Sequence, residues 1–370
     1  MKIILKDDSE ISKTLKFKSL ANVFISVEEK KAIKVLDKEN IIKYIQGLKE
    51  KYNLNKEKFI DYLFTKPNRK IYSHTENYTK LIMSFLFSGK YEDYPLHLIV
   101  FGETGTGKTF TLESIDPKFE EEKGIFESSG STLRGLIPSF REKPARMGYI
   151  LDCVRIGLID ELFKMIEKEE TGRYLEILTD YFSRLNMFLE HKDRTLASGN
   201  DSIRAKATAK LWIMTNPYKK KKTIYEHLDI MDRTTLSRMI PLVQTNEERE
   251  LINKKEIKIN KDKRITKEEF LTIYDSCQDF LIDMDEEKVK DIYKKTLTLT
   301  KEPMREVWKA RGLHHSILLL DGFVKFRCLF EEDDSFKAKS EDYEELETLL
   351  VYIIKSWDCL LRGWKTGDSF

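Results

Sequence analysis

The octapeptide GETGTGKT, residues 102–109, constrains the fold more than any other stretch, because it directly follows the apolar run LHLIVF. Gly102, Gly105 and Gly107 let the backbone approach phosphate groups with no Cβ in the way. Peptide N–H groups of such a loop, and the N-terminus of a helix after it, supply positive potential. The pattern predicts a strand, a phosphate-binding loop and a helix in succession. A glycine-rich turn that binds nothing is the alternative, and this context disfavours it.

The end of this loop carries two side chains suited to a nucleotide and its metal ion. Lys108 is expected to reach the β- and γ-phosphates, and the Thr109 hydroxyl to ligate Mg²⁺. The predicted ligands are therefore a nucleotide with a γ-phosphate, and Mg²⁺; the resemblance described below implies that the nucleotide is ATP. The residues expected to bind them are Gly102, Glu103, Thr104, Gly105, Thr106, Gly107, Lys108 and Thr109.

Two further apolar runs end in polar side chains. IGLIDE ends in Asp160, expected to hold Mg²⁺ through water, and in Glu161, expected to orient or deprotonate the attacking water. LWIMTNP ends in Asn216, whose amide can hydrogen-bond both a γ-phosphate and a water. The alternatives are an acidic helix start and a plain Asn-Pro turn. The order of the three motifs favours the catalytic interpretation.

The periodicity of the chain predicts an α/β fold. Strands are predicted at 96–101, 154–160, 209–216 and 239–244, with helices between them, which indicates a mostly parallel sheet covered on both faces. The other helices are predicted at 72–90, 267–282, 286–296, 303–331 and 340–362. We divide the chain into a helical N-terminal region (1–70), an α/β ATPase core (71–245), and a linker with an α-helical lid (246–370).

The composition limits the partners and the location. Charged residues make up 35% of the chain, yet the net charge is only +2, so any nucleic-acid contact must come from a local patch. None of the four cysteines lies in a CxxC pair, which indicates reduced thiols. No run approaches the roughly 18 apolar residues of a membrane span, and the first residues lack the apolar core of a signal peptide. We expect a cytoplasmic protein with no membrane partner.

Two arginines could act on a nucleotide from outside the loop. Arg238, in LSRM, lies between a short predicted helix and the last strand, and Arg311 begins a long apolar helix. A guanidinium fork suits the γ-phosphate of a neighbour's nucleotide. A surface salt bridge is the alternative, and for a lone arginine it is the better one.

The ordered set GETGTGKT, GLIDE, TNP and LSRM resembles that of an AAA+ ATPase, and more closely that of the minichromosome maintenance (MCM) helicases. The resemblance covers about residues 70–355. The segments that extend it beyond the core motifs are IYSHTENYTKLIMSFLFSG, ESSGSTLRGLIPSF, LIDELFKM, EHLDIMDRTTLSRMIPLV and ARGLHHSILLLDGFVKFRCL. It implies a P-loop AAA+ core with a helical lid, ATP hydrolysis, and translocation on, unwinding or remodelling of DNA.

The resemblance also implies a role for each motif residue. Asp160 and Glu161 match the Mg²⁺-binding and water-activating acids, and Asn216 matches the first sensor. Arg238 matches the arginine finger and Arg311 the second sensor. In this family both arginines act on the nucleotide of an adjacent subunit, so a homo-oligomeric ring, usually a hexamer, is implied.

Two loops are placed against DNA by the same resemblance. One is a hairpin at about 190–207, whose basic residues could meet phosphates in a central channel. These residues are Lys192, Arg194, Arg204 and Lys206, and a solvated polar loop is an equal alternative for each. The other is a short insertion, PSFREKPARMG, with Arg141, Lys143 and Arg146.

The chain also departs from the family. It shows no zinc-ligand pattern, has only about 70 mostly helical residues before the resemblance begins, and leaves no room for a terminal winged helix. We therefore expect a minimal MCM-like motor, of the kind that a mobile element encodes. The main alternative is an ATP-dependent loader that assembles and recruits a protein partner, for which the N-terminal region offers a docking surface. A remodeller of protein complexes ranks third.

Overall fold

The structure is a computed structural model. It describes residues 35–65, 74–102, 105–119, 124–127, 133–137, 148–169, 182, 185–186, 188–191, 194–198, 201–216, 233–244, 265–331 and 335–362. Within these ranges no helix has the length and apolar character needed to cross a membrane.

A five-stranded parallel sheet forms the centre of the molecule, in the order β4-β5-β8-β3-β9. Its strands are β3 (Leu98–Gly102), β4 (Phe126–Glu127), β5 (Ile156–Asp160), β8 (Lys210–Thr215) and β9 (Ile240–Gln244). Every residue of β3, β5, β8 and β9 is buried, as expected for strands covered on both faces. The four predicted strands are confirmed, and so is the α/β class. The edge strand β4 was not predicted, since two residues give no periodic signal.

The strand order decides which motifs become neighbours. β8 lies between β3 and β5, so the strand that precedes Asn216 separates the loop strand from the acidic strand. Phe101 pairs with Thr215, and Asp160 pairs with Met214. The carboxyl ends of these three strands therefore meet at one edge of the sheet, where α/β proteins bind their ligands.

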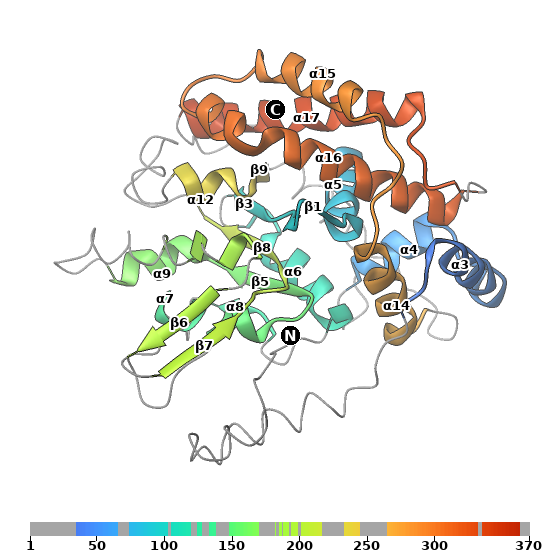
Figure 1. Cartoon of the computed structure of the whole chain (residues 1–370), viewed down its shortest axis with the longest axis horizontal. Helices are drawn as coiled ribbons and strands as arrows, with labels where there is room; N and C mark the ends of the chain where they lie inside the picture. Colours follow the sequence, from blue (N-terminus) through green and yellow to red (C-terminus); the bar gives the residue numbers. More distant parts are fainter. Residues whose placement is uncertain are drawn as a thin grey trace.

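Helices cover the sheet (Figure 1). The helices that precede the sheet or lie between its strands in the sequence are α5 (Glu76–Phe87), α6 (Lys108–Phe119), α7 (Leu133–Leu136), α8 (Tyr149–Asp152), α9 (Leu162–Glu169) and α12 (Arg233–Ser237). The C-terminal helices α14 (Lys267–Gln278), α15 (Glu286–Leu297), α16 (Met304–Phe330) and α17 (Ser340–Arg362) agree with the predicted ranges within a few residues. A Cβ on Gly322 of α16 would lie 1.9 Å from the Ser84 carbonyl oxygen, so α5 and α16 can pack this closely only around a glycine.

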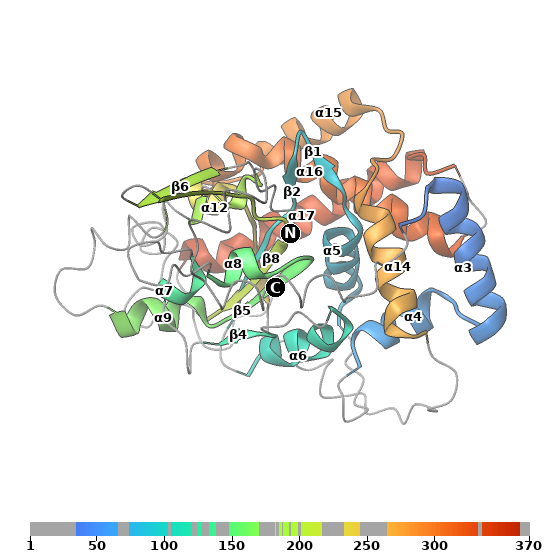
Figure 2. The ribbon, with the colours of Figure 1, turned by 60° about the horizontal axis from the view of Figure 1, so that its bottom comes forward.

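The described part of the N-terminal region belongs to the same hydrophobic core as the rest. Its helices α3 (Lys38–Tyr52) and α4 (Lys56–Leu63) begin at the N-caps Asp37 and Asn55. They lie beside α14 in both views (Figure 1, Figure 2). The Phe59 ring of α4 is fully buried, 5.9 Å from the Phe87 ring, 6.0 Å from that of Phe270 and 5.0 Å from that of Phe330. Helix α4 therefore joins the helices before and after the sheet, and residues 1–34 lie outside the described chain.

We predict that Phe59→Ala lowers the free energy of unfolding by about 3–5 kcal/mol, because it empties a site among five aromatic rings. Phe110→Ala is the matched control, since that ring is 44% exposed, and should cost about 0.5 kcal/mol or less. Urea unfolding followed by circular dichroism measures both. Equal losses would show that α4 is not part of the cooperative core.

Candidate functional site

The loop after β3 has the backbone that a phosphate site needs. Gly105 and Gly107 have φ angles of 88° and 90°, in the left-handed region that glycine adopts without strain. A Cβ on Gly102 would lie 2.9 Å from Thr106 Oγ1 and 3.1 Å from Lys108 Cδ. Side chains at these three positions would thus strain or fill the loop. Glu103 and Thr104, also predicted to bind the nucleotide, lie outside the described residues.

Lys108 is buried at the start of α6 and is held by neutral oxygens. Its Nζ donates to the Gly102 carbonyl oxygen at 2.5 Å and to Asn216 Oδ1 at 2.8 Å. Gln244, at the end of β9, donates from Nε2 to the Thr106 carbonyl oxygen at 2.9 Å and so fixes the loop from the other side. Gln244 is not among the residues predicted to form the site. The signal was available, because Gln244 is the one polar residue that ends the buried run MIPLVQ.

Asp160 and Thr109 together offer oxygen ligands for a metal ion. Thr109 Oγ1 donates to Asp160 Oδ2 at 3.0 Å. Asp160 Oδ1 is buried and has no hydrogen-bond partner among the described residues. Burial raises the pKa of Asp160 above its ordinary value, while the Thr109 hydrogen bond and the Lys108 charge oppose the rise. An orphaned, buried carboxylate oxygen beside a hydroxyl fits Mg²⁺, a hard cation that prefers oxygen.

A metal ion here would take few ligands from the protein. Within the described ranges, no group of three or more His, Cys, Asp or Glu side chains could hold a metal ion. Mg²⁺ in nucleotide sites usually keeps several waters and binds one or two protein oxygens plus phosphate oxygens. The pair Thr109 and Asp160 is therefore sufficient for such a site, and the predicted metal ligands lie together.

Glu161 is held in a strained backbone conformation next to Asp160. Its φ is 56°, which is uncommon for a residue other than glycine, and its N–H donates to the Met214 carbonyl oxygen at 2.7 Å. Asn216 Nδ2 donates to Glu161 Oε1 at 3.0 Å, and Lys164 Nζ donates to Oε2 at 2.6 Å. Because Asn216 also accepts from Lys108, one amide links the loop lysine to the carboxylate across the width of β8.

Arg238 and Arg311 lie at the opposite edge of the sheet. Arg238 precedes β9, whose first residue Ile240 pairs with Leu98 at the start of β3, whereas the phosphate loop follows Gly102 at its end. At about 3.3 Å per residue, β3 separates the two edges by about 13 Å. Within one chain, these arginines therefore do not join Lys108 and Glu161.

The two arginines share one carboxylate that the sequence analysis did not identify. Arg238 Nη2 lies 2.5 Å from Glu190 Oε1, and Arg311 Nη2 lies 3.4 Å from the same oxygen. Arg238 Nη1 also donates to the Thr234 carbonyl oxygen at 2.9 Å. The Arg311 guanidinium stands 4.7 Å from the centre of the Tyr94 ring, a cation–π contact. We call Glu190, Arg238 and Arg311 the arginine cluster.

Three buried histidines hold the segments that carry this cluster. His97 Nδ1 accepts from the Leu211 N–H at 3.0 Å, so its Nε2 carries the proton and donates to the Leu189 carbonyl oxygen at 2.9 Å. His191 Nε2 donates to the Ala209 carbonyl oxygen, and His315 Nε2 to that of Ser237, both at 2.9 Å. Imidazole hydrogen bonds thus hold Leu189 and His191, on either side of Glu190, and Ser237, which precedes Arg238.

Burial keeps these imidazoles neutral. It lowers the pKa of His97 to about 4 and that of His315 to about 3, and it holds the pKa of His191 well below its ordinary value. The Arg311 charge lowers the pKa of both His97 and His315 further, and the Arg238 charge lowers that of His97. A neutral ring can donate from one nitrogen and accept at the other, as His97 does.

The segment predicted to contact DNA is an antiparallel hairpin of β6 (Arg194–Ser198) and β7 (Asp201–Ala205). Arg194 pairs with Ala205, and Arg204 with Thr195. Lys206 follows β7 and is half-buried, whereas Lys192 lies outside the described residues. The hairpin stands at the side of the molecule away from α15 and α17 (Figure 1). The insertion with Arg141, Lys143 and Arg146 is likewise outside the described chain.

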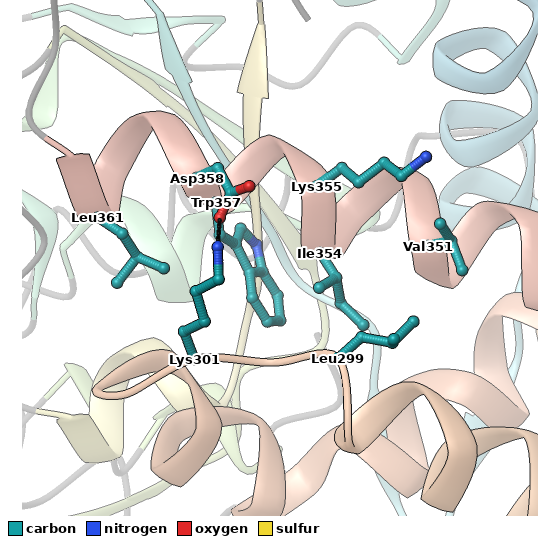
Figure 3. Close-up of a pocket in the computed structure, with 8 residues that line it drawn as sticks. All are labelled: Leu299, Lys301, Val351, Ile354, Lys355, Trp357, Asp358 and Leu361. Atoms are coloured by element: carbon teal, nitrogen blue, oxygen red, sulfur yellow. Dashed lines mark hydrogen bonds and ion pairs between the residues drawn. The ribbon is translucent and has the colours of Figure 1, made fainter.

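A cavity of about 200 Å³ lies elsewhere, between α17 and the segment that joins α15 to α16. Figure 3 shows Leu299, Ile354 and Trp357 along it, with Lys301 pointing toward Asp358, 3.0 Å away. It shares no residue with the phosphate loop, the acidic strand or the arginine cluster, so it is not part of the candidate site.

Comparison with known proteins adds no further assignment. No protein-family model matches the sequence, and a search of curated proteins found no match.

We predict that the stability of the fold decreases as the pH falls from about 6.5 toward 4. Unfolded histidines take up protons near pH 6.5, whereas His97 and His315 stay neutral until about pH 4 and 3 in the folded protein. In that window each histidine lowers the free energy of unfolding by about 1.4 kcal/mol for every pH unit of acidification. Above the window it has no such effect.

Urea unfolding at a series of pH values measures this slope. His315→Gln should reduce it by about 1.4 kcal/mol per pH unit, because the amide can still donate to Ser237 but does not titrate. An unchanged slope would mean that His315 does not contribute to the acid sensitivity.

Proposed function

We propose that this chain is an ATPase that hydrolyses ATP at the interfaces between copies of itself and uses the energy to translocate on, unwind or remodel DNA. One observation carries the proposal. A continuous set of hydrogen bonds joins Lys108, Asn216 and Glu161, and Thr109 with Asp160 stands beside it, at the edge where the phosphate loop begins α6. The resemblance to MCM helicases supports the same reaction.

Each side chain can perform one step in the hydrolysis of the β–γ phosphoanhydride bond of ATP. Lys108 would exchange its neutral oxygen partners for phosphate oxygens, which are better acceptors for an ammonium group. Thr109 and Asp160 would hold Mg²⁺, which would neutralise charge on the phosphates. Glu161 accepts a proton from the attacking water through a carboxylate that Asn216 orients. Asn216 and Lys164 hold the two carboxylate oxygens of Glu161, so little reorganisation is needed before reaction.

The position of the arginine cluster supports action between subunits. Arg238 lies near the start of β3, whose length of about 13 Å separates it from the loop of its own chain, and Arg311 shares Glu190 with it, so both are placed to act on a nucleotide bound by a neighbour. A complete site would then combine the phosphate loop of one subunit with the arginines of another, which requires a homo-oligomer. A ring, as a hexamer, is the form that the family resemblance implies.

The DNA track is proposed from the hairpin of β6 and β7. Lys192, Arg194, Arg204 and Lys206 give this hairpin and its flanks four basic residues. Phosphate contacts of this type weaken as salt increases, with a linear dependence of the logarithm of the binding constant on the logarithm of the salt concentration. Such a dependence separates a DNA motor from a remodeller of proteins.

We predict that Glu161→Gln leaves ATP binding intact and lowers the hydrolysis rate at least about hundredfold, because the amide cannot accept the proton of the attacking water. Fluorescent-nucleotide binding and phosphate release measure the two effects. Glu287→Gln, an exposed change of the same type on α15, is the control and should change neither. Normal hydrolysis by Glu161→Gln would exclude this residue as the base.

The same phosphate-release assay tests the track. Single-stranded or duplex DNA should raise the rate in an oligomeric species, and strand displacement should require ATP. Hydrolysis that is indifferent to DNA would instead favour the ATP-dependent loader.

We further predict that Arg238→Ala abolishes hydrolysis but not ATP binding, and that mixing it with Glu161→Gln restores activity. In the mixture, an interface is complete where the first variant binds ATP and the second supplies Arg238. Random mixing in equal amounts gives about a quarter of such interfaces in a head-to-tail assembly. Activity that stays absent in the mixture would contradict action between subunits.

A further inference from the structure

Glu190 has no role in the reaction as proposed, yet it occupies both arginines that the reaction would use. Its carboxylate is only 14% exposed, and the side chains of Arg238 and Arg311 are 12% and 21% exposed. Among these three side chains, two positive charges face one negative charge. The cluster therefore keeps an excess of positive charge in a poorly hydrated place, which attracts a further anion.

The Arg238 guanidinium donates hydrogen bonds through its two terminal nitrogens. Nη2 donates to Glu190, Nη1 donates to the Thr234 carbonyl oxygen, and Nε is buried without a hydrogen-bond partner among the described residues. A buried, unpaired N–H is costly. The arrangement therefore satisfies the guanidinium incompletely, and a ligand with several oxygens can satisfy it better.

The backbone around the cluster is fixed, so the side chains are the parts that can move. His97 holds Leu189, His191 holds its own segment to Ala209, and His315 holds Ser237. Glu190 lies between these two anchored residues, and its carboxylate contacts both arginines. An anion that binds the same guanidinium groups competes with it.

We propose that Glu190 is a latch that occupies Arg238 and Arg311 in the separate subunit and is displaced by the triphosphate of a nucleotide bound to an adjacent copy of the chain. This inference rests on the proposed function. Carboxylates and phosphates bind the same guanidinium fork, so they compete for it. A triphosphate offers more charge and more oxygens than one carboxylate, so the exchange is favourable when a loaded neighbour is present. Assembly then costs the release of Glu190, which makes it depend on nucleotide.

The test is Glu190→Gln, which keeps the size of the side chain and an accepting oxygen but removes the charge. With Mg²⁺ and a non-hydrolysable ATP analogue, we expect the protein concentration for half-maximal assembly to fall about tenfold, the effect of losing one charged hydrogen bond that opposes it. Without nucleotide, assembly should be unchanged. Sedimentation velocity over a range of protein concentrations measures both conditions, and a purely structural residue would not give a gain that requires nucleotide.

Glu287→Gln is the matched control, and Glu190→Asp is a second variant that retains the charge and keeps the test open if Glu190→Gln does not fold. The aspartate should shift assembly in the same direction by a smaller factor, because it is one methylene too short to hold both arginines. Unchanged or weaker nucleotide-dependent assembly of the folded variants would overturn the latch. So would a lower hydrolysis rate at saturating protein with an unchanged midpoint, since Glu190 would then position the arginines.

The two levels of the proposal fail in different ways. If the unmodified protein neither hydrolyses ATP nor assembles with the analogue, both the proposed function and the role of Glu190 as a latch are wrong. If the unmodified protein does both and Glu190→Gln matches it at every concentration, only the latch is wrong.

Discussion

The parallel alignment of five buried strands is the constraint on which the rest of the structure depends. Because β3, β5 and β8 run in the same direction and in register, the residues that follow them meet at one edge, and the residues that precede them meet at the other. The first edge collects Lys108, Asp160 and Asn216. The second receives Arg238. A single sheet thus keeps the predicted catalytic groups and the predicted arginines apart by the length of a strand.

The order of the strands decides which side chains at that edge become neighbours. β8 lies between the loop strand and the acidic strand, so the amide of Asn216 has Lys108 on one side and Glu161 on the other. An amide has both an acceptor and a donor, and here each meets the partner that it suits. A carboxylate at that position could accept from the lysine but would repel Glu161. The residue type follows from the place of its strand in the sheet.

Local patterns predicted the strands, the C-terminal helices and the loop, because each depends on neighbours in the sequence. They could not predict the order of the sheet, since buried strands share one apolar pattern. Glu190 and His97 were not predicted because their hydrogen-bond partners lie 48 and 114 residues away in the sequence, and no nearby residue signals the contact. Gln244 could have been predicted, because it is a polar residue at the end of a buried strand, and Asn216 likewise follows a buried strand.

The separation of the two edges also restricts the symmetry of any assembly that uses both. A two-fold dimer brings the same patch of each subunit to one interface, so it would need the loop and the arginine cluster to share one face. They lie at opposite ends of β3. An interface that joins the carboxyl ends of the strands in one subunit to their amino ends in the next would bring the loop and the cluster together. Such head-to-tail contacts close into a ring or continue as a filament. The ring that the resemblance implies and the loader that competes with it thus require the same interface, and they differ in what the assembled surface then binds.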